Sequence, residues 1–472
     1  MNKESNNFQE EQEISDALLR YEQMLKMGAH LYFDVFQLEH IIENFLEEGK
    51  LYPALQAVDM GLNQHPTSLT LKVKKASILL NIGEISQALD LANELILIEK
   101  TNYELYLIKG SSHLLMDNPE EARLAFNAAL NYTIEVKAET LFNIGFAYEQ
   151  NEEYELAISY LKDSVELEPQ NDEVLYELAY CYEKINEDHK SIDIYNQYLD
   201  IEPFSDSAWF NMGILYTKLK DYEKSIWAYE FALAINDDFP NAWFNIGHSN
   251  MLLENYKDAI KHFKKFLEYD NENEEIFCLI ADCFYYLKKH TKAIKYFAKT
   301  LKINPLNANA LYKTGLICMM NNDYKQAFDL LKRAIKVDDE NAKYHYTYAL
   351  VAEKLRKYKD AGESYETACE LKPGKLKYWL SFAEMQFNRG QVVKAVATLY
   401  QAFEFHTENP LIDYRLAAYL LESNFERKAS KHLVRALKND YSNHPFLFES
   451  FPEAKNYESI ISLIKKYSPI GS

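Results

Sequence analysis

The sequence is poor in the residues that break helices. Only 13 glycines and 12 prolines occur among 472 residues, whereas 48% of the residues are hydrophobic. A loop-rich protein needs more glycine and proline, and a disordered chain carries fewer hydrophobic residues. The composition therefore predicts a folded, mainly helical protein with short connections.

Cysteines and long apolar runs are also scarce. No two of the cysteines form a CxxC pair, and their number is odd: Cys181, Cys278, Cys283, Cys318 and Cys369. This pattern speaks against a disulfide framework or a zinc site and favours a reducing compartment. The chain has no apolar run of about 18 residues. Its first segment, MNKESNNFQEEQE, lacks the apolar core of a signal peptide. We therefore expect a soluble, cytoplasmic protein that does not enter a membrane.

Motifs that carry catalysis or bind cofactors are absent. The sequence contains no Walker-type GKS/T loop, no GxGxxG, no HExxH and no cluster of Cys and His residues. The net charge of −21 suits a nucleic-acid partner poorly. We expect a protein that is not an enzyme and that needs neither a metal ion nor another cofactor.

The charge is distributed unevenly along the chain. Residues 1–250 carry a net charge of −27, and residues 251–472 carry +6. Such an asymmetry can steer association between molecules. The simpler interpretation, which we favour, is that it only keeps the surface soluble.

A repeat with a period of 34 residues runs through most of the sequence. SAWFNMG from Ser207 returns as NAWFNIG from Asn241, and the same register holds from residue 138 to residue 443. Three further repeats precede this stretch at 35–68, 69–102 and 103–137, which gives twelve repeats in total. Each repeat contains two helical patterns separated by short turns.

Small residues recur at two positions of the repeat. Position 8 is Gly or Ala in eleven of the twelve repeats, and position 20 is Ala or Ser in all of them. A small residue on each of two neighbouring helices lets their backbones approach closely. Larger residues at positions 4, 7, 11 and 24, such as Trp209, Met212, Tyr216 and Tyr229, are expected to fill the space around this crossing. Gly at position 15 and Pro at position 32 mark the turns in several repeats.

This pattern resembles that of the tetratricopeptide repeat over residues 35–443. It departs from the family pattern at position 4 in Leu38, Lys72 and Asp413, and seven repeats lack the proline. The resemblance implies an all-α, right-handed α-solenoid of about twelve helix pairs, with the first helix of each pair on the concave side. Residues 14–34 are expected to form an N-terminal capping helix and residues 444–472 C-terminal capping helices. Residues 1–13 are expected to be disordered.

The concave side should present positions 2, 5, 6, 9, 12 and 13 of each first helix, because positions 4, 8 and 11 face the second helix. In repeats 4–7 this stripe is aromatic and rich in amides. The predicted peptide-binding residues are Phe142, Asn143, Phe146, Tyr176, Tyr180, Phe210, Asn211, Phe244, Asn245 and His248.

The asparagines at position 6 resemble the rungs of the ladder that binds substrate backbone in the repeats of O-linked N-acetylglucosamine transferase. Glu177 and Leu279 interrupt the series. Two other interpretations stay open: these residues are common in the family generally, and an asparagine at position 6 can also bond to a neighbouring helix. The hypothesis is an interaction scaffold that binds an extended peptide or protein segment. The alternative is a structural protein that self-associates head to tail through its charges.

A second group of residues is basic and is expected on the convex side. It consists of Lys261, Lys265, Lys295, Lys299 and Arg333 at positions 22 and 26. A solvated outer face is the simpler interpretation of this convex basic patch. The functional alternative is docking of an acidic partner, such as the acidic half of another copy.

Overall fold

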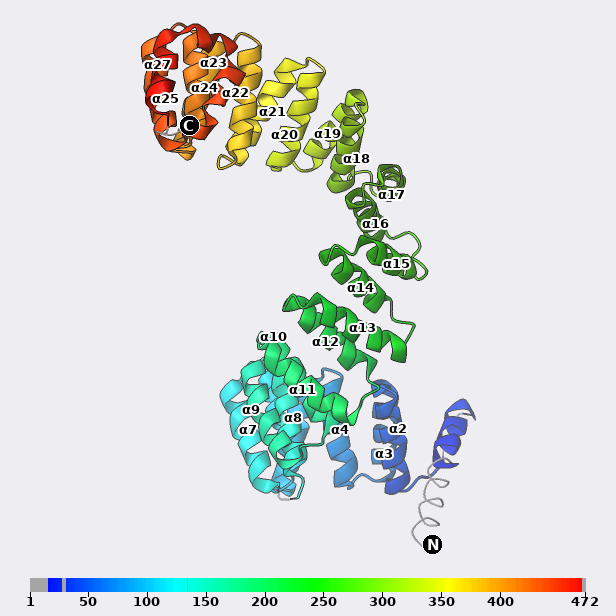
Figure 1. The fold of residues 1–472 in the computed structure, drawn as a ribbon. Helices are drawn as coiled ribbons and strands as arrows, with labels where there is room; N and C mark the ends of the chain where they lie inside the picture. The colour runs from blue at the N-terminus through cyan, green and yellow to red at the C-terminus, as the bar shows by residue number, and fades with distance from the viewer. Residues whose placement is uncertain (1–15, 28–30, 134, 469–472) are drawn as a thin grey trace. The chain divides into compact units, whose positions relative to one another are not determined.

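The computed structural model describes residues 16–27, 31–133 and 135–468, and within these ranges every regular element is a helix. The chain divides into two compact units, and the division lies between Ala242 and Trp243. Figure 1 labels helices of both units. We call them the N-terminal unit and the C-terminal unit and describe each by itself.

The helices alternate as the first and second members of pairs. The first helices are α2 (Val35–Glu47), α4 (Leu69–Asn81), α6 (Tyr103–Leu115), α8 (Lys137–Gln150), α10 (Asp172–Lys184), α12 (Asp206–Lys218), α14 (Pro240–Leu252), α16 (Glu274–Tyr286), α18 (Ala308–Met320), α20 (Ala342–Lys354), α22 (Leu376–Asn388) and α24 (Pro410–Glu422). The second helices are α3 (Leu51–Gln64), α5 (Ile85–Ile98), α7 (Pro119–Tyr132), α9 (Tyr154–Leu167), α11 (Asp188–Ile201), α13 (Tyr222–Ile235), α15 (Tyr256–Phe266), α17 (His290–Ile303), α19 (Tyr324–Val337), α21 (Tyr358–Leu371), α23 (Val392–Phe405) and α25 (Glu426–Asn439).

The first helices from α12 to α24 begin 34 residues apart, as the sequence period predicts. Several of them have an N-cap residue whose side chain accepts a hydrogen bond from a backbone N–H of the first turn. Ser205, for example, accepts from the N–H of Ala208 at the start of α12. The α-solenoid of helix pairs expected from the sequence is confirmed.

In the sixth repeat the small residue at position 8 is explained by the ring at position 24. A Cβ placed on Gly213 of α12 would lie 2.4 Å from Cε1 of Tyr229 on α13, a ring that is 1% exposed. In the first repeat the volumes are exchanged: Ile42 stands at position 8 and Val58 at position 24, and both are fully buried. The two positions therefore share one space, which either residue can fill.

The turn within each pair uses the left-handed conformation. In all twelve repeats the residue at position 15 has positive φ, and only Gly49, Gly83 and Gly390 among these are glycines. At Lys220 the φ is 63°. Two hydrogen bonds hold this turn: the N–H of Lys220 donates to the carbonyl of Thr217 at 3.0 Å, and that of Asp221 donates to Tyr216 at 2.9 Å. These bonds close the end of the first helix and offset the cost of the left-handed residue, roughly 1–2 kcal/mol.

Further helices stand at both ends of the repeats. Residues 16–27 are helical, and the Tyr21 ring packs edge-on against Phe33 at 5.9 Å and Phe45 at 5.8 Å. At the other end, α26 (Pro445–Ser450) is followed by α27 (Glu458–Lys466), which buries Ile460 and Ile464 and packs against α25. The expected disorder of residues 1–13 concerns a segment outside the described residues.

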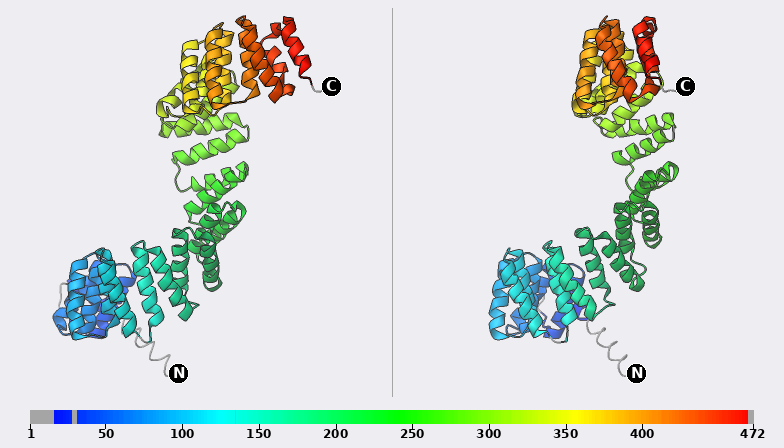
Figure 2. Two further views of the ribbon diagram at one scale, coloured as in Figure 1. Left: turned by 90° about the vertical axis from the view of Figure 1, so that its left-hand side faces the viewer. Right: turned by 60° about the vertical axis from the view of Figure 1, so that its left-hand side comes forward.

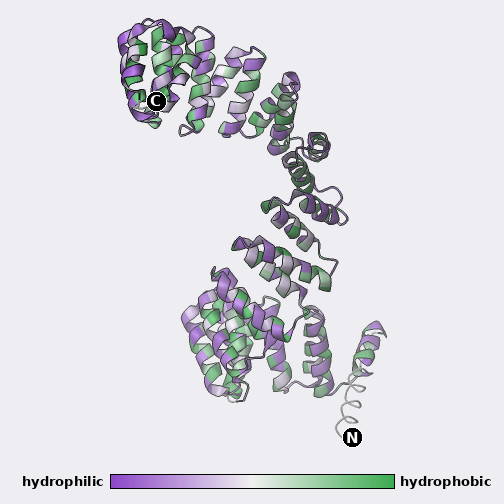
Figure 3. Cartoon of the chain, viewed as in Figure 1, coloured by the Kyte–Doolittle hydropathy of each residue, from purple (hydrophilic) through white to green (hydrophobic). Residues whose placement is uncertain are grey.

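Within each unit the paired helices lie side by side (Figure 2). Most helices carry hydrophobic and hydrophilic residues on the same element (Figure 3), as amphipathic helices of a two-layer stack do. In the N-terminal unit, for example, Phe126, Ile144 and Leu161 belong to one buried cluster. No helix among residues 16–27, 31–133 and 135–468 has the length and apolar character required to cross a bilayer.

Candidate functional site

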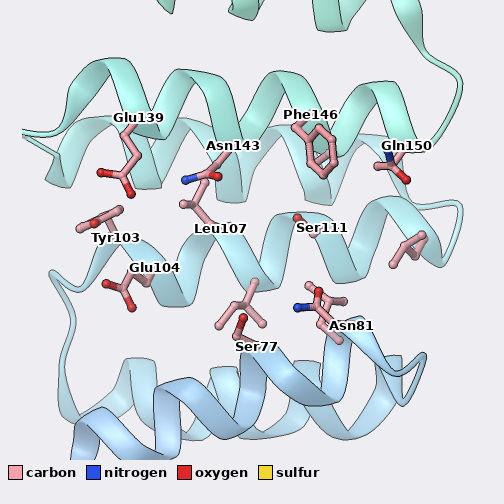
Figure 4. A pocket seen from close by; sticks show the side chains of 14 residues that line it. Ser77, Asn81, Tyr103, Glu104, Leu107, Ser111, Glu139, Asn143, Phe146 and Gln150 are labelled. Atoms are coloured by element: carbon pink, nitrogen blue, oxygen red, sulfur yellow. The ribbon is translucent and has the colours of Figure 1, made fainter. Parts of the chain in front are cut away.

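A cavity opens in the N-terminal unit over three consecutive first helices, α4, α6 and α8. Its volume is about 420 Å³, and Figure 4 shows the side chains that face it. The lining residues are Ser77, Leu80, Asn81, Tyr103, Glu104, Leu107, Ile108, Ser111, Leu115, Glu139, Asn143, Phe146, Ala147 and Gln150.

The cavity changes in character from one end to the other. Glu104 and Glu139 lie at one end, in the first turns of α6 and α8, and Asn81 and Gln150 lie at the opposite end (Figure 4). Burial raises the pKa of Glu104, and Lys74 opposes this effect. No Lys or Arg is among the lining residues. The cavity therefore favours a ligand with hydrogen-bonding groups and without net negative charge.

Two serines create the space. Ser77 and Ser111 occupy position 9 of their repeats, where α8 carries Phe146 and α10 carries Tyr180. The short side chains leave room that the larger ones would fill. Sequence reasoning had placed the groove at repeats 4–7, whereas this cavity spans repeats 2–4. Two serines in succession at position 9 are the signal that could have located it.

Of the predicted groove residues, Asn143 and Phe146 line this cavity. Phe142 lies beside Phe146, with 6.0 Å between the ring centroids. Tyr176 and Tyr180 lie on α10 and do not reach it. That these five residues bind a peptide stays a prediction.

Asn211 is engaged within the fold. Its Nδ2 donates to the hydroxyl of Tyr176 and to the hydroxyl of Tyr195, each at 3.0 Å. Both amide hydrogens are therefore taken, and only Oδ1 remains to accept a bond from a ligand. The interpretation that an asparagine at position 6 bonds to a neighbouring helix applies at this position.

The remaining predicted residues pack against aromatic neighbours. The Phe210 ring lies 4.6 Å from Phe239, and both are half-buried. On α14, Phe244 stacks on His248 at 6.3 Å, and Asn245 beside it is half-buried. These contacts account for part of the aromatic stripe as packing within the fold.

A pair of carboxyl groups lies between α8 and α10. Glu149 is only 7% exposed, and Glu177 is half-buried. Burial, followed by the adjacent Glu177, raises the pKa of Glu149 to about 8. Burial also raises the pKa of Glu177. Two carboxyl groups this close cannot both ionise readily, so the pair holds a proton at neutral pH. Glu177 and Glu149 occupy positions 6 and 12, which the sequence assigns to the concave stripe, but the period alone does not predict that they pair.

Glu149→Gln is expected to stabilise the N-terminal unit by about 1–2 kcal/mol above pH 8. The folded state keeps on Glu149 a proton that the unfolded chain loses near the ordinary value of 4.5, so stability falls as pH rises from there to about 8. Glutamine cannot ionise and still donates to Glu177, although Lys184 opposes part of the gain. Hydrogen exchange of α8 and α10 at pH 5, 7 and 9 measures the difference in stability between the variant and the wild type.

The matched control is Glu155→Gln, which changes an exposed glutamate on α9 and should alter stability by less than about 0.5 kcal/mol. A loss of protection in Glu149→Gln at high pH would contradict the paired carboxyls.

The convex basic patch is exposed, and three of its five members have local contacts. Lys265 Nζ lies 3.2 Å from Glu268 Oε2, Lys299 Nζ lies 4.6 Å from the centroid of the Phe277 ring, and Arg333 donates to the carbonyl of Pro305 at 3.1 Å. The other two members are Lys261 and Lys295. These contacts favour the interpretation as a solvated outer face.

The C-terminal unit also has a wide hollow, of about 960 Å³. Tyr312 and Tyr346 line it, with Lys343 Nζ over the first ring at 5.2 Å and Lys377 Nζ over the second at 5.4 Å. In charge it differs from the cavity of the N-terminal unit, since its lining includes four lysines and two carboxylates.

Comparison with known protein families supports the repeat assignment. Tetratricopeptide repeat models match residues 149–212, 206–239, 240–273 and 274–305. A model of the anaphase-promoting complex, cyclosome, subunit 3 matches residues 292–368. A comparison with curated proteins found no match.

Several solved structures are similar to parts of the chain. MamA is 25% identical, with 34% of this chain and 94% of MamA covered and a TM-score of 0.33. YrrB, described as a TPR protein with an unusual peptide-binding site, is 18% identical, with 42% and 97% covered and a TM-score of 0.36. The C-terminal part of a TPR repeat-containing protein from Cytophaga hutchinsonii is 17% identical, with 50% and 97% covered and a TM-score of 0.45.

The helix pairs recur at the family's period, small residues stand where its helices cross, and its models match consecutive repeats along the chain. The chain is therefore a tetratricopeptide repeat protein.

Proposed function

We propose that the protein is a non-enzymatic scaffold that holds an extended segment of a partner protein in the groove formed by α4, α6 and α8. Tetratricopeptide repeats serve generally as scaffolds for interactions between proteins. The observation that carries the proposal is the cavity of about 420 Å³ on these three helices. The partner is a protein or peptide segment rather than a nucleic acid or a membrane.

The lining suits an extended backbone. Asn81, Asn143 and Gln150 each offer donors and an acceptor, and Ser77 and Ser111 add hydroxyl groups. Leu107 and Phe146 supply apolar contact between these polar groups. An extended peptide presents N–H and C=O groups alternately with side chains, so a groove of mixed lining can satisfy both.

The cysteines support a reducing compartment, and we keep the cytoplasm as the proposed location. All five cysteines are free and buried in the structure. Burial raises the pKa of four of them most clearly, namely Cys181, Cys278, Cys283 and Cys369, which makes their thiolates scarce.

A photo-reactive amino acid tests the location of the groove. Placed at Ser111, it should cross-link one defined segment of a partner in the host cell. Placed at Leu124, which is 62% exposed on α7, it should not cross-link that segment. Equal labelling from both positions would count against the groove.

Ser111→Tyr is expected to weaken binding of the cross-linked segment at least about tenfold. The new ring would fill the cavity, and the fold should accept it because Tyr180 occupies the same position in its own repeat. Fluorescence anisotropy with the labelled segment measures the affinity. Leu124→Tyr is the matched control and should leave the affinity unchanged. Unchanged affinity in Ser111→Tyr would exclude this cavity as the binding site.

Self-association is the second candidate function. It is favoured by the charge difference between the two units, since residues 1–250 carry −27 and residues 251–472 carry +6. If opposite charges join copies head to tail, sedimentation velocity should show larger species at low salt that dissociate at high salt. A mass independent of salt would leave the peptide-binding scaffold as the better candidate.

A further inference from the structure

Glu149 and Glu177 form a site that lacks a positive charge. Glu149 is 7% exposed, and its Oε2 is buried without a hydrogen-bond partner. No ion pair found within the described residues includes either carboxyl group. A buried carboxyl in this state is costly to the fold, and such costs are typical of sites that a ligand completes.

Lys184, whose charge partly opposes the rise in the pKa of Glu149, is directed toward an aromatic ring. Lys184 stands on α10, and its Nζ lies 4.6 Å from the centroid of the Tyr180 ring. Glu173, one turn before Glu177, adds further negative charge. Among the residues that the structure describes, no cation is therefore in direct contact with the pair.

The pair adjoins the groove. Glu149 follows Phe146 by three residues on α8, so the two side chains share a face of the helix. Glu177 occupies on α10 the position that Asn143 occupies on α8. Packed helices lie about 8–10 Å apart, and an extended chain advances about 3.3 Å per residue. A segment that fills the cavity would therefore reach the pair about three residues further along.

We propose that Glu149 and Glu177 receive a cationic side chain, a lysine or an arginine, of the segment held in the groove. The inference rests on the proposed function and adds the chemistry of the partner. The cation displaces the proton that the two carboxyl groups share, and it pairs with both. The Glu104 and Glu139 end of the cavity extends the same preference for positive charge.

A peptide array tests the proposal with the full-length protein. The probes are dodecapeptides with random flanks and with lysine, arginine, norleucine or glutamate at the centre. The wild-type protein should bind the lysine and arginine peptides about tenfold more tightly than the norleucine peptides. In Glu149→Gln/Glu177→Gln this preference should fall to less than about twofold, while binding of the norleucine peptides is retained.

The control separates the pair from the general acidity of the chain. Glu153→Gln/Glu155→Gln removes two exposed carboxylates near the turn before α9 and on α9, and it should keep the wild-type preference. Glu177→Lys should abolish the preference for lysine and arginine peptides, because the new lysine would itself pair with Glu149.

Each result points to one conclusion. No binding to any peptide would overturn the proposed function itself. Binding without a cation preference, or a preference that survives in Glu149→Gln/Glu177→Gln, would overturn this inference and leave the scaffold in place. A preference lost equally in Glu153→Gln/Glu155→Gln would assign it to the overall charge and would also overturn the inference.

Discussion

Gly213→Ile is expected to destabilise the sixth repeat by about 3 kcal/mol. A Cβ alone at this position would lie 2.4 Å from Cε1 and 2.5 Å from Cδ1 of Tyr229, and isoleucine adds three more carbons. The Tyr229 ring is 1% exposed and has no solvent into which it can turn. Hydrogen exchange of α12 and α13 in the full chain measures the loss locally, which matters because repeat arrays often do not unfold in one step.

A second substitution should rescue the first. Tyr229→Val in the Gly213→Ile background recreates the combination of Ile42 and Val58, which packs fully buried in the first repeat. Tyr229→Val alone should cost about 2–3 kcal/mol through the cavity it leaves. The double variant should therefore be more stable than either single variant. The interaction energy between the two substitutions is then favourable, although each substitution alone is destabilising.

Gly213→Ala serves as the mild control. Other repeats combine alanine at position 8 with a ring at position 24, as Ala179 does with Tyr195, so a small shift of the ring accommodates the methyl group. Alanine also gains about 1 kcal/mol in helix propensity. A large loss in Gly213→Ala, or no rescue by Tyr229→Val, would show that the two positions do not share one space.

The repeat register predicted most of the fold. Because twelve repeats share one period, the sequence predicts where the two helices of a pair cross and where each first helix starts. It also predicts that second helices end before the proline. For example, α11 ends at Ile201, two residues before Pro203. The turn conformation was predictable only in part. Glycine marks it in three repeats, whereas Lys220 and Arg356 adopt the same left-handed conformation through the hydrogen bonds of the helix end.

The candidate site was less predictable, because a period does not show how side chains on neighbouring repeats meet. Position 6 places Asn143 on the cavity, yet the same position places the amide of Asn211 between two tyrosine hydroxyls. The difference arises from Tyr176 and Tyr195, which lie 35 and 16 residues away in sequence. The cavity also depends on two small residues, Ser77 and Ser111. A search of the sequence for aromatic and amide side chains does not detect such serines.

Asp413 is a departure from the repeat pattern that the structure explains. It occupies position 4, where most other repeats carry a large apolar or aromatic residue, and it is fully buried. Arg435 Nε donates to Asp413 Oδ2 at 2.6 Å, and its second nitrogen bonds the other oxygen. His432 Nδ1 lies 2.7 Å from Oδ1, and Tyr400 lies 3.0 Å from the other nitrogen of this ring. An ionic cluster thus fills a space that most other repeats fill with an apolar or aromatic side chain.

Arg435→Met is expected to destabilise α24 and α25 by about 3 kcal/mol at pH 7, because it leaves the buried carboxylate of Asp413 without its main partner. Burial would raise the pKa of Asp413, but hydrogen bonds from His432 and Arg435 outweigh burial and hold it below its ordinary value of 3.8. In the wild type the cluster therefore loses its stabilising effect only as pH falls below about 3.8. Hydrogen exchange of the two helices between pH 4 and pH 8 measures the difference.

The pH dependence and a double variant distinguish a lost ion pair from lost packing. The deficit of Arg435→Met should shrink as pH falls, since a protonated Asp413 needs no cation. Asp413→Leu/Arg435→Met should recover most of the stability, because it removes both charges and returns position 4 to the apolar type found in other repeats. The stability of Arg435→Lys should lie between those of the wild type and Arg435→Met. Lysine keeps the positive charge but cannot form the bidentate contact with Asp413. A deficit that is equal at every pH and persists in Asp413→Leu/Arg435→Met would instead assign the loss to the contact between Arg435 and the Phe403 ring, at 4.3 Å.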